Sequence, residues 1–115
     1  MLANVDEEYA YLTTSGRITG ADHEIEIWFA SDGVTLWLIS GGQDRSDWVR
    51  NLLADPRARV RIGDQTLTVR ARSAVADATE RDTAARLLPA KYATQVSASA
   101  DQWVVDAYLV ALDPD

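Results

Sequence analysis

The segment from residue 40 to residue 51 has the composition of an anion-binding turn. It places two adjacent glycines, Gly41 and Gly42, between a β-like run and the start of a predicted helix. Glycine lets the backbone turn with positive φ or approach a ligand closely, and the free N–H groups of a helix start attract negative charge. Ser46 or Asp44 could cap that helix. The alternative is a plain strand-to-helix connection, in which the glycines serve only the turn.

Arginine is concentrated in the middle of the chain and is a second candidate for anion binding. Lys91 is the only lysine, whereas seven of the arginines cluster at positions 45, 50, 57, 59, 61, 70 and 72. A guanidinium can hold a phosphate or a carboxylate through two parallel hydrogen bonds. The alternative is a solvated face whose arginines pair with the abundant Asp and Glu, at about 0 to 1 kcal/mol per pair.

Three further side chains could contact a ligand. His23 is the only histidine, and the chain has no cysteine, so a metal site is not expected. Trp28 is predicted on a polar strand face beside Glu24 and Glu26, where it could form a ligand wall or a dimer contact. Tyr92 could donate a hydrogen bond to a substrate oxygen, although a packing role is the simpler alternative. No acid, base and nucleophile are spaced as a catalytic set, so an enzyme built from this chain needs a cofactor.

Alternating hydrophobic residues predict six or seven strands. Strands are expected over residues 9–14, 23–30, 34–40, 57–62, 65–73 and 103–112, the last with a short helix as the alternative. Turn signals favour hairpins between neighbours, including one between 23–30 and 34–40. If Gly63 and Asp64 form a two-residue loop, the strands around them acquire a defined register. The cross-strand pairs are then Arg61 with Thr66, Arg59 with Thr68 and Arg57 with Arg70, and one face becomes an arginine stripe.

Two helices are predicted. The first spans residues 46–54, where apolar residues recur at helical spacing, and it ends before Pro56. The second opens at a capping box formed by Thr79 and Asp82 and is limited or kinked by Pro89. Strands joined mainly by hairpins, with two helices, favour a mainly β, antiparallel, closed or nearly closed barrel with helices at its rim.

Composition places the chain among ordinary soluble proteins. Its 115 residues are 47% hydrophobic and carry a net charge of −7. We expect a single domain over residues 1–115, of which residues 1–8 could be flexible. The acidic balance argues against nucleic acid as a partner. No secretory signal or transmembrane run is visible, so a cytoplasmic location is expected.

In combination, these motifs resemble the deazaflavin-dependent nitroreductase family. The matching pieces are residues 12–20 (LTTSGRITG), the strand at 26–29, the turn at 31–33, the SGG at 40–42 and the helix motif at 48–56. The resemblance covers residues 10 to 75. It implies a split β-barrel with two or three peripheral helices, related to pyridoxamine-phosphate-oxidase-like and FMN-binding proteins. It also implies coenzyme F-420, a deazaflavin that delivers hydride to nitro compounds, quinones or other conjugated acceptors.

The resemblance also implies cofactor contacts. Arg17 would meet the phosphate and acidic tail of the cofactor, and Trp48 and Asn51 match the family's helix motif. A basic residue often follows the glycine turn in the family, and here His23 stands there. The other implied contacts are Trp28 near the ring, and Ser40, Gly41, Gly42, Arg45 and Ser46 around the phosphate and ring edge. Tyr92 is the only match to the tyrosines of nitroreducing members, and Ser46-Asp47 replaces a proline common in the family.

Three hypotheses about function follow. The leading one is an F-420-dependent oxidoreductase, with FMN as the alternative cofactor because some expected basic residues are missing. The second is a carrier on the same barrel that holds a flavin, a haem-derived molecule or a fatty acid without turnover. The third is a structural domain that forms dimers. A homodimer is expected in any case, since related barrels often pair through their sheets.

Overall fold

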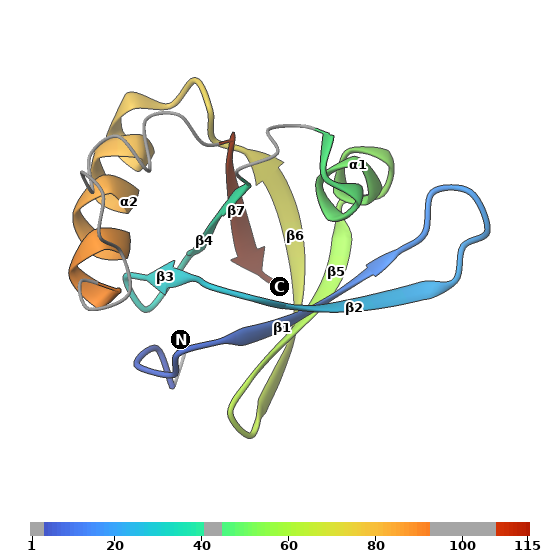
Figure 1. The fold of residues 1–115 in the computed structure, drawn as a ribbon, viewed down its shortest axis with the longest axis horizontal. Coiled ribbons are helices and arrows are strands. Elements are labelled where there is room, and N and C mark those ends of the chain that lie inside the picture. Colours follow the sequence, from blue (N-terminus) through green and yellow to red (C-terminus); the bar gives the residue numbers. More distant parts are fainter. Residues whose placement is uncertain (1–3, 41–44, 93–107) are drawn as a thin grey trace.

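The computed structural model describes residues 4–40, 45–92 and 108–115. Figure 1 shows seven strands and two helices in this part of the chain. They are β1 (Ala10–Ser15), β2 (Asp22–Ile27), β3 (Ala30–Ser31), β4 (Leu36–Ser40), α1 (Asp47–Ala54), β5 (Arg57–Ile62), β6 (Gln65–Ser73), α2 (Ala78–Lys91) and β7 (Tyr108–Pro114). The mainly β prediction is confirmed. The predicted last strand overlaps β7, and its first part, residues 103–107, lies outside the described residues.

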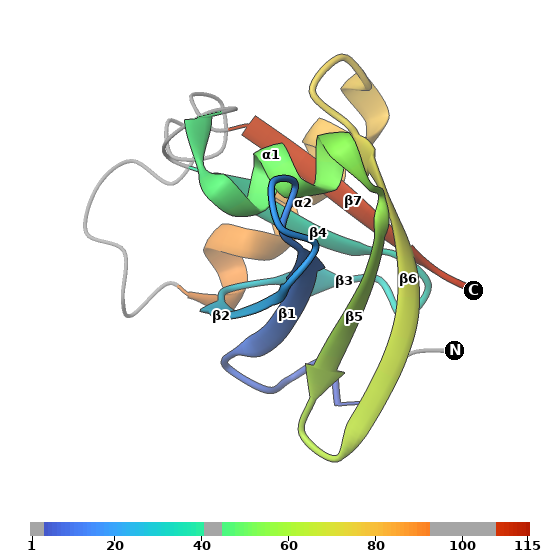
Figure 2. The same cartoon turned by 90° about the vertical axis from the view of Figure 1, so that its right-hand side faces the viewer.

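All seven strands form one antiparallel sheet that curls into a half-barrel. Their order is β2-β1-β5-β6-β7-β4-β3, so β2 and β3 are the two edges. Only residues 28 and 29 separate these edge strands along the chain. Because such a connection spans about 11 Å at most, the two edges must come together, and the sheet curls (Figures 1 and 2). The structure therefore confirms the split-barrel prediction.

The hairpin of β5 and β6 has the predicted register. Arg61 pairs with Thr66, Arg59 with Thr68 and Arg57 with Arg70. The arginines of this stripe are exposed. Arg59 donates to a carboxylate oxygen of Asp22 at 2.9 Å, and the Arg61 guanidinium lies 4.3 Å from the centre of the Tyr11 ring. These are the contacts expected of a solvated sheet face.

The strand predicted over residues 23–30 is interrupted. Its first part, β2, pairs with β1, and only Ala30 and Ser31 pair with β4. The predicted hairpin between 23–30 and 34–40 is therefore wrong over most of its length. At the break, the Phe29 N–H donates to the Tyr92 hydroxyl at 3.0 Å, and the Phe29 carbonyl accepts from Lys91 Nζ at 3.1 Å. Side chains of the α2 end thus supply the hydrogen bonds that a sheet neighbour would otherwise make.

The break also moves Trp28 away from its predicted position. Because β2 ends at Ile27, Trp28 does not continue the polar strand face of Glu24 and Glu26. Its ring instead stacks on that of Tyr92, with centroids 4.2 Å apart and planes 7° from parallel. Trp28 is half-buried and packs against the cluster beneath α2.

Helix α2 begins earlier and runs further than predicted. Asp77 caps it, because its side chain accepts a hydrogen bond from the Glu80 N–H at 2.9 Å. The predicted capping box of Thr79 and Asp82 is therefore two residues late. Pro89 lies inside the helix, which ends at Lys91. Near a helix end the missing N–H of proline costs only one hydrogen bond, so the helix continues for two more residues.

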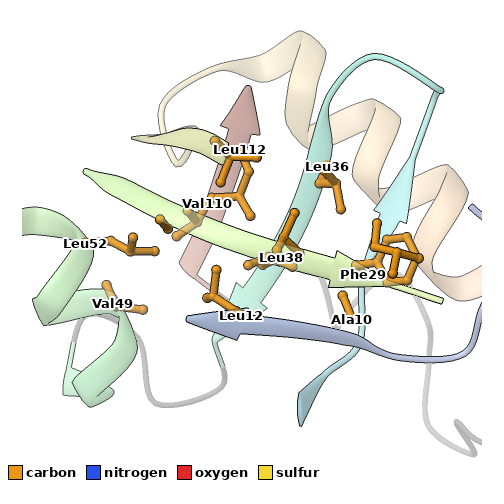
Figure 3. Close-up of a cluster of buried hydrophobic side chains, with 13 residues drawn as sticks. Ala10, Leu12, Phe29, Leu36, Leu38, Val49, Leu52, Val110 and Leu112 are labelled. Atoms are coloured by element: carbon orange, nitrogen blue, oxygen red, sulfur yellow. The ribbon is translucent and has the colours of Figure 1, made fainter. Parts of the chain in front are cut away.

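Apolar side chains fill the barrel and attach both helices. Figure 3 shows Leu12, Leu38 and Val110 in the interior, with Val49 and Leu52 of α1 packed against them. Helix α2 packs separately, through its own buried residues, on the cluster around Trp37 and Leu109. Within the described residues, neither helix is long and apolar enough to cross a membrane. The packing of α1 sets its position beside β1, where a pocket forms.

Candidate functional site

A pocket of about 540 Å³ lies between α1 and the turn that joins β1 to β2. Its volume is within the roughly 300–1,000 Å³ common for small-molecule sites. The described residues that line it are Thr14, Gly16, Arg17, Ile18, Thr19, His23, Glu24, Ile25, Asp47, Trp48 and Asn51. The residues come from β1, β2, the turn between them and the first half of α1. The pocket therefore depends on the packing of the hairpin against the helix.

Two glycines shape the turn that carries Arg17. The Gly16 N–H donates to the Ala21 carbonyl at 2.7 Å, and the Gly20 N–H donates to the Gly16 carbonyl at 2.8 Å. A Cβ atom at Gly16 would lie 2.8 Å from Nε2 of His23, which no side chain tolerates without movement. Gly20 has φ of +77°, a conformation that favours glycine. These constraints keep the turn tight and direct Arg17 toward α1.

Asn51 connects this turn to the helix and to the barrel. Its Oδ1 accepts from the Arg17 backbone N–H at 3.2 Å and from Arg17 Nη1 at 2.9 Å. Its Nδ2 donates to the Thr14 hydroxyl at 3.1 Å. Asn51 and Thr14 are only 4% and 2% exposed. A buried amide with all these bonds has one orientation, so it holds the Arg17 guanidinium in place.

Asp47 supplies the second partner of Arg17. Its carboxylate lies 3.3 Å from Arg17 Nη2, and the two side chains are 86% and 28% exposed respectively. An ion pair so open to water contributes about 0–1 kcal/mol. The guanidinium therefore has one fixed, buried partner in Asn51 and one weakly held, exposed partner in Asp47.

The pocket suits a ligand that combines a flat ring with an anionic group. Ile25 and Trp48 provide apolar and aromatic surface, while Arg17 provides positive charge held by a buried amide. Such a guanidinium can bind an anion with little rearrangement. Within the described part of the chain, no group of three or more His, Cys, Asp or Glu side chains could hold a metal ion.

Comparison with protein families shows to which family the chain belongs. The family described as F420H(2)-dependent quinone reductase matches the chain over residues 3–106. The chain belongs to this family. The resemblance drawn from the sequence motifs is thereby confirmed. The family consists of oxidoreductases that depend on coenzyme F-420. Among curated proteins, none matches the chain significantly.

Solved structures share the fold at low sequence identity. An F420-H2-dependent reductase is 19% identical with a TM-score of 0.70, and the match covers 100% of both chains. A structure described as an F420 reductase is 22% identical with a TM-score of 0.62, over 97% of this chain and 90% of the other. An FAD-binding protein from Mesorhizobium loti is 10% identical with a TM-score of 0.70, over 96% and 82%. Likeness at these identities shows the split-barrel fold.

The pocket brings together four of the residues predicted from the sequence. Arg17, His23, Trp48 and Asn51 all line it. Of the remaining predicted contacts near α1, Ser40, Arg45 and Ser46 are not among the described residues that line it. Ser40 and Ser46 contact each other through their hydroxyl groups at 2.6 Å, Arg45 is exposed just before α1, and Gly41 and Gly42 lie outside the described residues. Ser46 precedes the helix as predicted, but its side chain makes no capping hydrogen bond.

Tyr92, at the C-terminal end of α2, and Trp28, which stacks on it, belong to the cluster packed by α2 and do not line the pocket. The Tyr92 hydroxyl is buried, donates to the Glu8 carbonyl at 2.7 Å and accepts from the Phe29 N–H. These are the contacts of a tyrosine that stabilises the fold, which was the alternative to a catalytic role. The catalytic role stays a prediction.

Two polar residues that shape the site, Thr14 and Asp47, were not predicted from the sequence. Thr14 belongs to the inward face of β1 with Ala10 and Leu12, so a buried hydroxyl could have been inferred from the strand alternation. Asp47 was noted only as part of a replacement for proline. Nothing in its local sequence shows that it meets Arg17, because the two residues are 30 positions apart.

The pKa shifts of two groups at the C-terminal end of α2, Lys91 and Tyr92, predict an unusual dependence of stability on pH. Burial lowers the pKa of Lys91 to about 8, although Asp6 and Glu7 nearby oppose this. The ordinary lysine pKa is about 10.4, so between these values the unfolded chain binds more protons and the free energy of unfolding should rise with pH. Burial raises the pKa of Tyr92 to about 12. Above about pH 10 the unfolded chain loses the tyrosine proton first, so the free energy should then fall.

Urea unfolding at closely spaced pH values between 7 and 12 tests this pair of trends. Lys91→Met should remove the rise above pH 8, and Tyr92→Phe should remove the fall above pH 10. If both variants keep the pH profile of the wild type, Lys91 and Tyr92 do not carry these shifts.

Proposed function

We propose that this chain binds coenzyme F-420 in the pocket beside α1 and uses its reduced form to reduce a quinone or another conjugated, electron-poor acceptor, including nitro compounds. The observation that carries the proposal is the guanidinium of Arg17, fixed by the buried Asn51 beside an apolar wall. When bound, the deazaflavin supplies the hydride, and the acceptor gains one hydride and one proton. Membership of the quinone reductase family supports this chemistry.

The residues of the chain would orient the two reactants. Arg17 would bind the phosphate or an acidic group of the cofactor, and Trp48 and Ile25 would pack against its ring and keep water from that face. Thr14 and Asn51 would hold the Arg17 side chain in position and would not contact the cofactor themselves. His23 and Glu24 are exposed at the lining and could exchange a proton with the product through solvent.

FMN is the alternative cofactor, and the fold likeness to an FAD-binding protein is the observation that favours testing it. A carrier that binds a flavin without turnover is the alternative function. The single-domain boundaries of residues 1–115, a cytoplasmic location and a homodimer also remain proposals. The molar mass in solution would test the homodimer.

Titration of the purified protein with F-420 and, separately, with FMN tests the proposal. Because Trp48 lines the pocket, binding should quench tryptophan fluorescence, and we expect a Kd for F-420 in the micromolar range or below, about −8 kcal/mol. Protein with reduced F-420 should then oxidise it when a quinone is added.

Each outcome of this titration separates the hypotheses. Binding without oxidation of the reduced cofactor supports the carrier. Tighter binding of FMN supports the alternative cofactor. Absence of binding of either molecule at tens of micromolar contradicts the proposed function.

A further inference from the structure

The two partners of Arg17 differ in how firmly they are held. Asn51 is buried and bonded on both sides, to Arg17 and to Thr14. Asp47 has an 86% exposed side chain and one contact with Arg17 at 3.3 Å. A ligand that approaches the guanidinium can therefore displace Asp47 without disturbing Asn51. The displaced carboxylate stays at the first turn of α1, beside the incoming anion.

The charges of the other lining residues increase the effect of the Asp47 carboxylate on anion binding. Among the described lining residues, Arg17 is the one cationic side chain, while Asp47 and Glu24 are both acidic. The whole chain carries a net charge of −7. One guanidinium against two carboxylates attracts a singly charged anion weakly and a doubly charged anion poorly, since each added negative charge is repelled by the acidic pair.

We propose that Asp47 is a specificity-determining residue, which neutralises Arg17 in the free protein and selects ligands whose group at Arg17 carries a single negative charge. This inference rests on the proposed function. A phosphodiester, as in F-420, has no second ionisable proton, and each carboxylate of an acidic tail is also singly charged. A terminal phosphate monoester, as in FMN, carries a charge of about −1.5 to −2 at pH 7. At the group bound by Arg17, Asp47 therefore favours the phosphodiester or a single carboxylate of F-420 over the phosphate monoester of FMN, independently of the ring.

The variant Asp47→Asn removes the charge and keeps the size of the side chain. Affinities for F-420, FMN and riboflavin are measured by tryptophan fluorescence in the wild type and the variant. We expect the affinity for FMN to rise about fivefold, that for F-420 about twofold and that for riboflavin, which has no phosphate, to stay unchanged. Since the ring is the same in FMN and riboflavin, the comparison isolates the phosphate.

Asp82→Asn is the matched control. Asp82 is exposed on α2, which packs on a different cluster of the barrel, and its replacement changes the net charge equally. The proposal is overturned if Asp82→Asn gives the same gain, if riboflavin binding improves as much as FMN binding, or if Asp47→Asn changes no affinity. Urea unfolding of both variants confirms that they are folded.

A cofactor-independent measurement separates failure of this inference from failure of the proposed function. Methyl phosphate and dimethyl phosphate are titrated while the backbone amide signal of Arg17 is followed by NMR. Asp47→Asn should strengthen the response to methyl phosphate more than that to dimethyl phosphate. If this holds while F-420 and FMN do not bind, the proposed function fails and the role of Asp47 stands. Equal responses to both phosphates in wild type and variant refute the role of Asp47.

Discussion

Asn51→Ala should lower the free energy of unfolding by about 2–4 kcal/mol and, with it, loosen the cofactor site. The side chain is 4% exposed and makes three hydrogen bonds, to the Arg17 N–H, to Arg17 Nη1 and to the Thr14 hydroxyl. Alanine would leave a small cavity and the buried Thr14 hydroxyl without this partner. It would also release the turn of residues 16–20 from α1. Urea denaturation measures the stability, and titration with F-420 measures the site.

Leu53→Ala provides the comparison within the same helix. Leu53 is 59% exposed, so its truncation to alanine should cost much less than that of Asn51. A double-mutant cycle of Asn51→Ala with Thr14→Val isolates the Thr14–Asn51 contact. We expect a coupling free energy of about 0.5–3 kcal/mol in the stability of the protein. Equal losses for Asn51→Ala and Leu53→Ala would falsify the structural role given to Asn51.

Arg17→Ala should weaken binding of F-420 about 10- to 100-fold, the effect of losing a charged hydrogen-bonding group worth about 1.5–3 kcal/mol. The free energy of unfolding should change by less than about 1 kcal/mol, because the ion pair with Asp47 is exposed. Asn51 Oδ1 also keeps one partner in the backbone N–H of residue 17. Binding and stability are therefore expected to separate in this variant, in contrast to Asn51→Ala.

Two variants make the result for Arg17 specific. Arg50→Ala removes the same charge from an exposed position of α1 that does not line the pocket, and F-420 binding should be unchanged. Arg17→Lys keeps the charge but loses the planar fork, so it should bind with intermediate affinity. If Arg17→Ala and Arg50→Ala bind F-420 equally well, the anion does not bind at Arg17.

Local sequence was sufficient where neighbouring residues determine the structure. The alternation of residues 57–62 and 65–73 around Gly63-Asp64 predicted the register of β5 and β6, and each predicted pair is found. The apolar spacing after Ser46 predicted α1 to within one residue. The combined motifs predicted the family and its split barrel. In each case the signal is a period, a turn or an ordered set of motifs, which the chain carries in its own sequence.

Tertiary structure alone decided which neighbour each part of a segment meets. The sequence of residues 22–31 predicts extended chain throughout. In the folded barrel, however, β2 pairs with β1 and β3 pairs with β4. Between β2 and β3, the backbone of Phe29 makes its hydrogen bonds with the side chains of Tyr92 and Lys91. This is why the predicted position of Trp28 on a polar strand face is wrong, and why the packing contacts of Tyr92 could not be predicted. The contacts that place these two residues cross more than 60 positions of the chain, which no local pattern records.

In the candidate site, too, some features could be predicted from the sequence and others follow only from the fold. The sequence by itself identified an arginine in a glycine-flanked turn and an Asn-bearing helix as motifs of the family, which has a split-barrel fold. Only the folded chain decided that Asn51 holds Arg17 from one side and Asp47 covers it from the other, since these contacts join β1, its following turn and α1 across 30 to 37 positions. Local periodicity specifies elements, whereas the packing of elements specifies which polar groups meet.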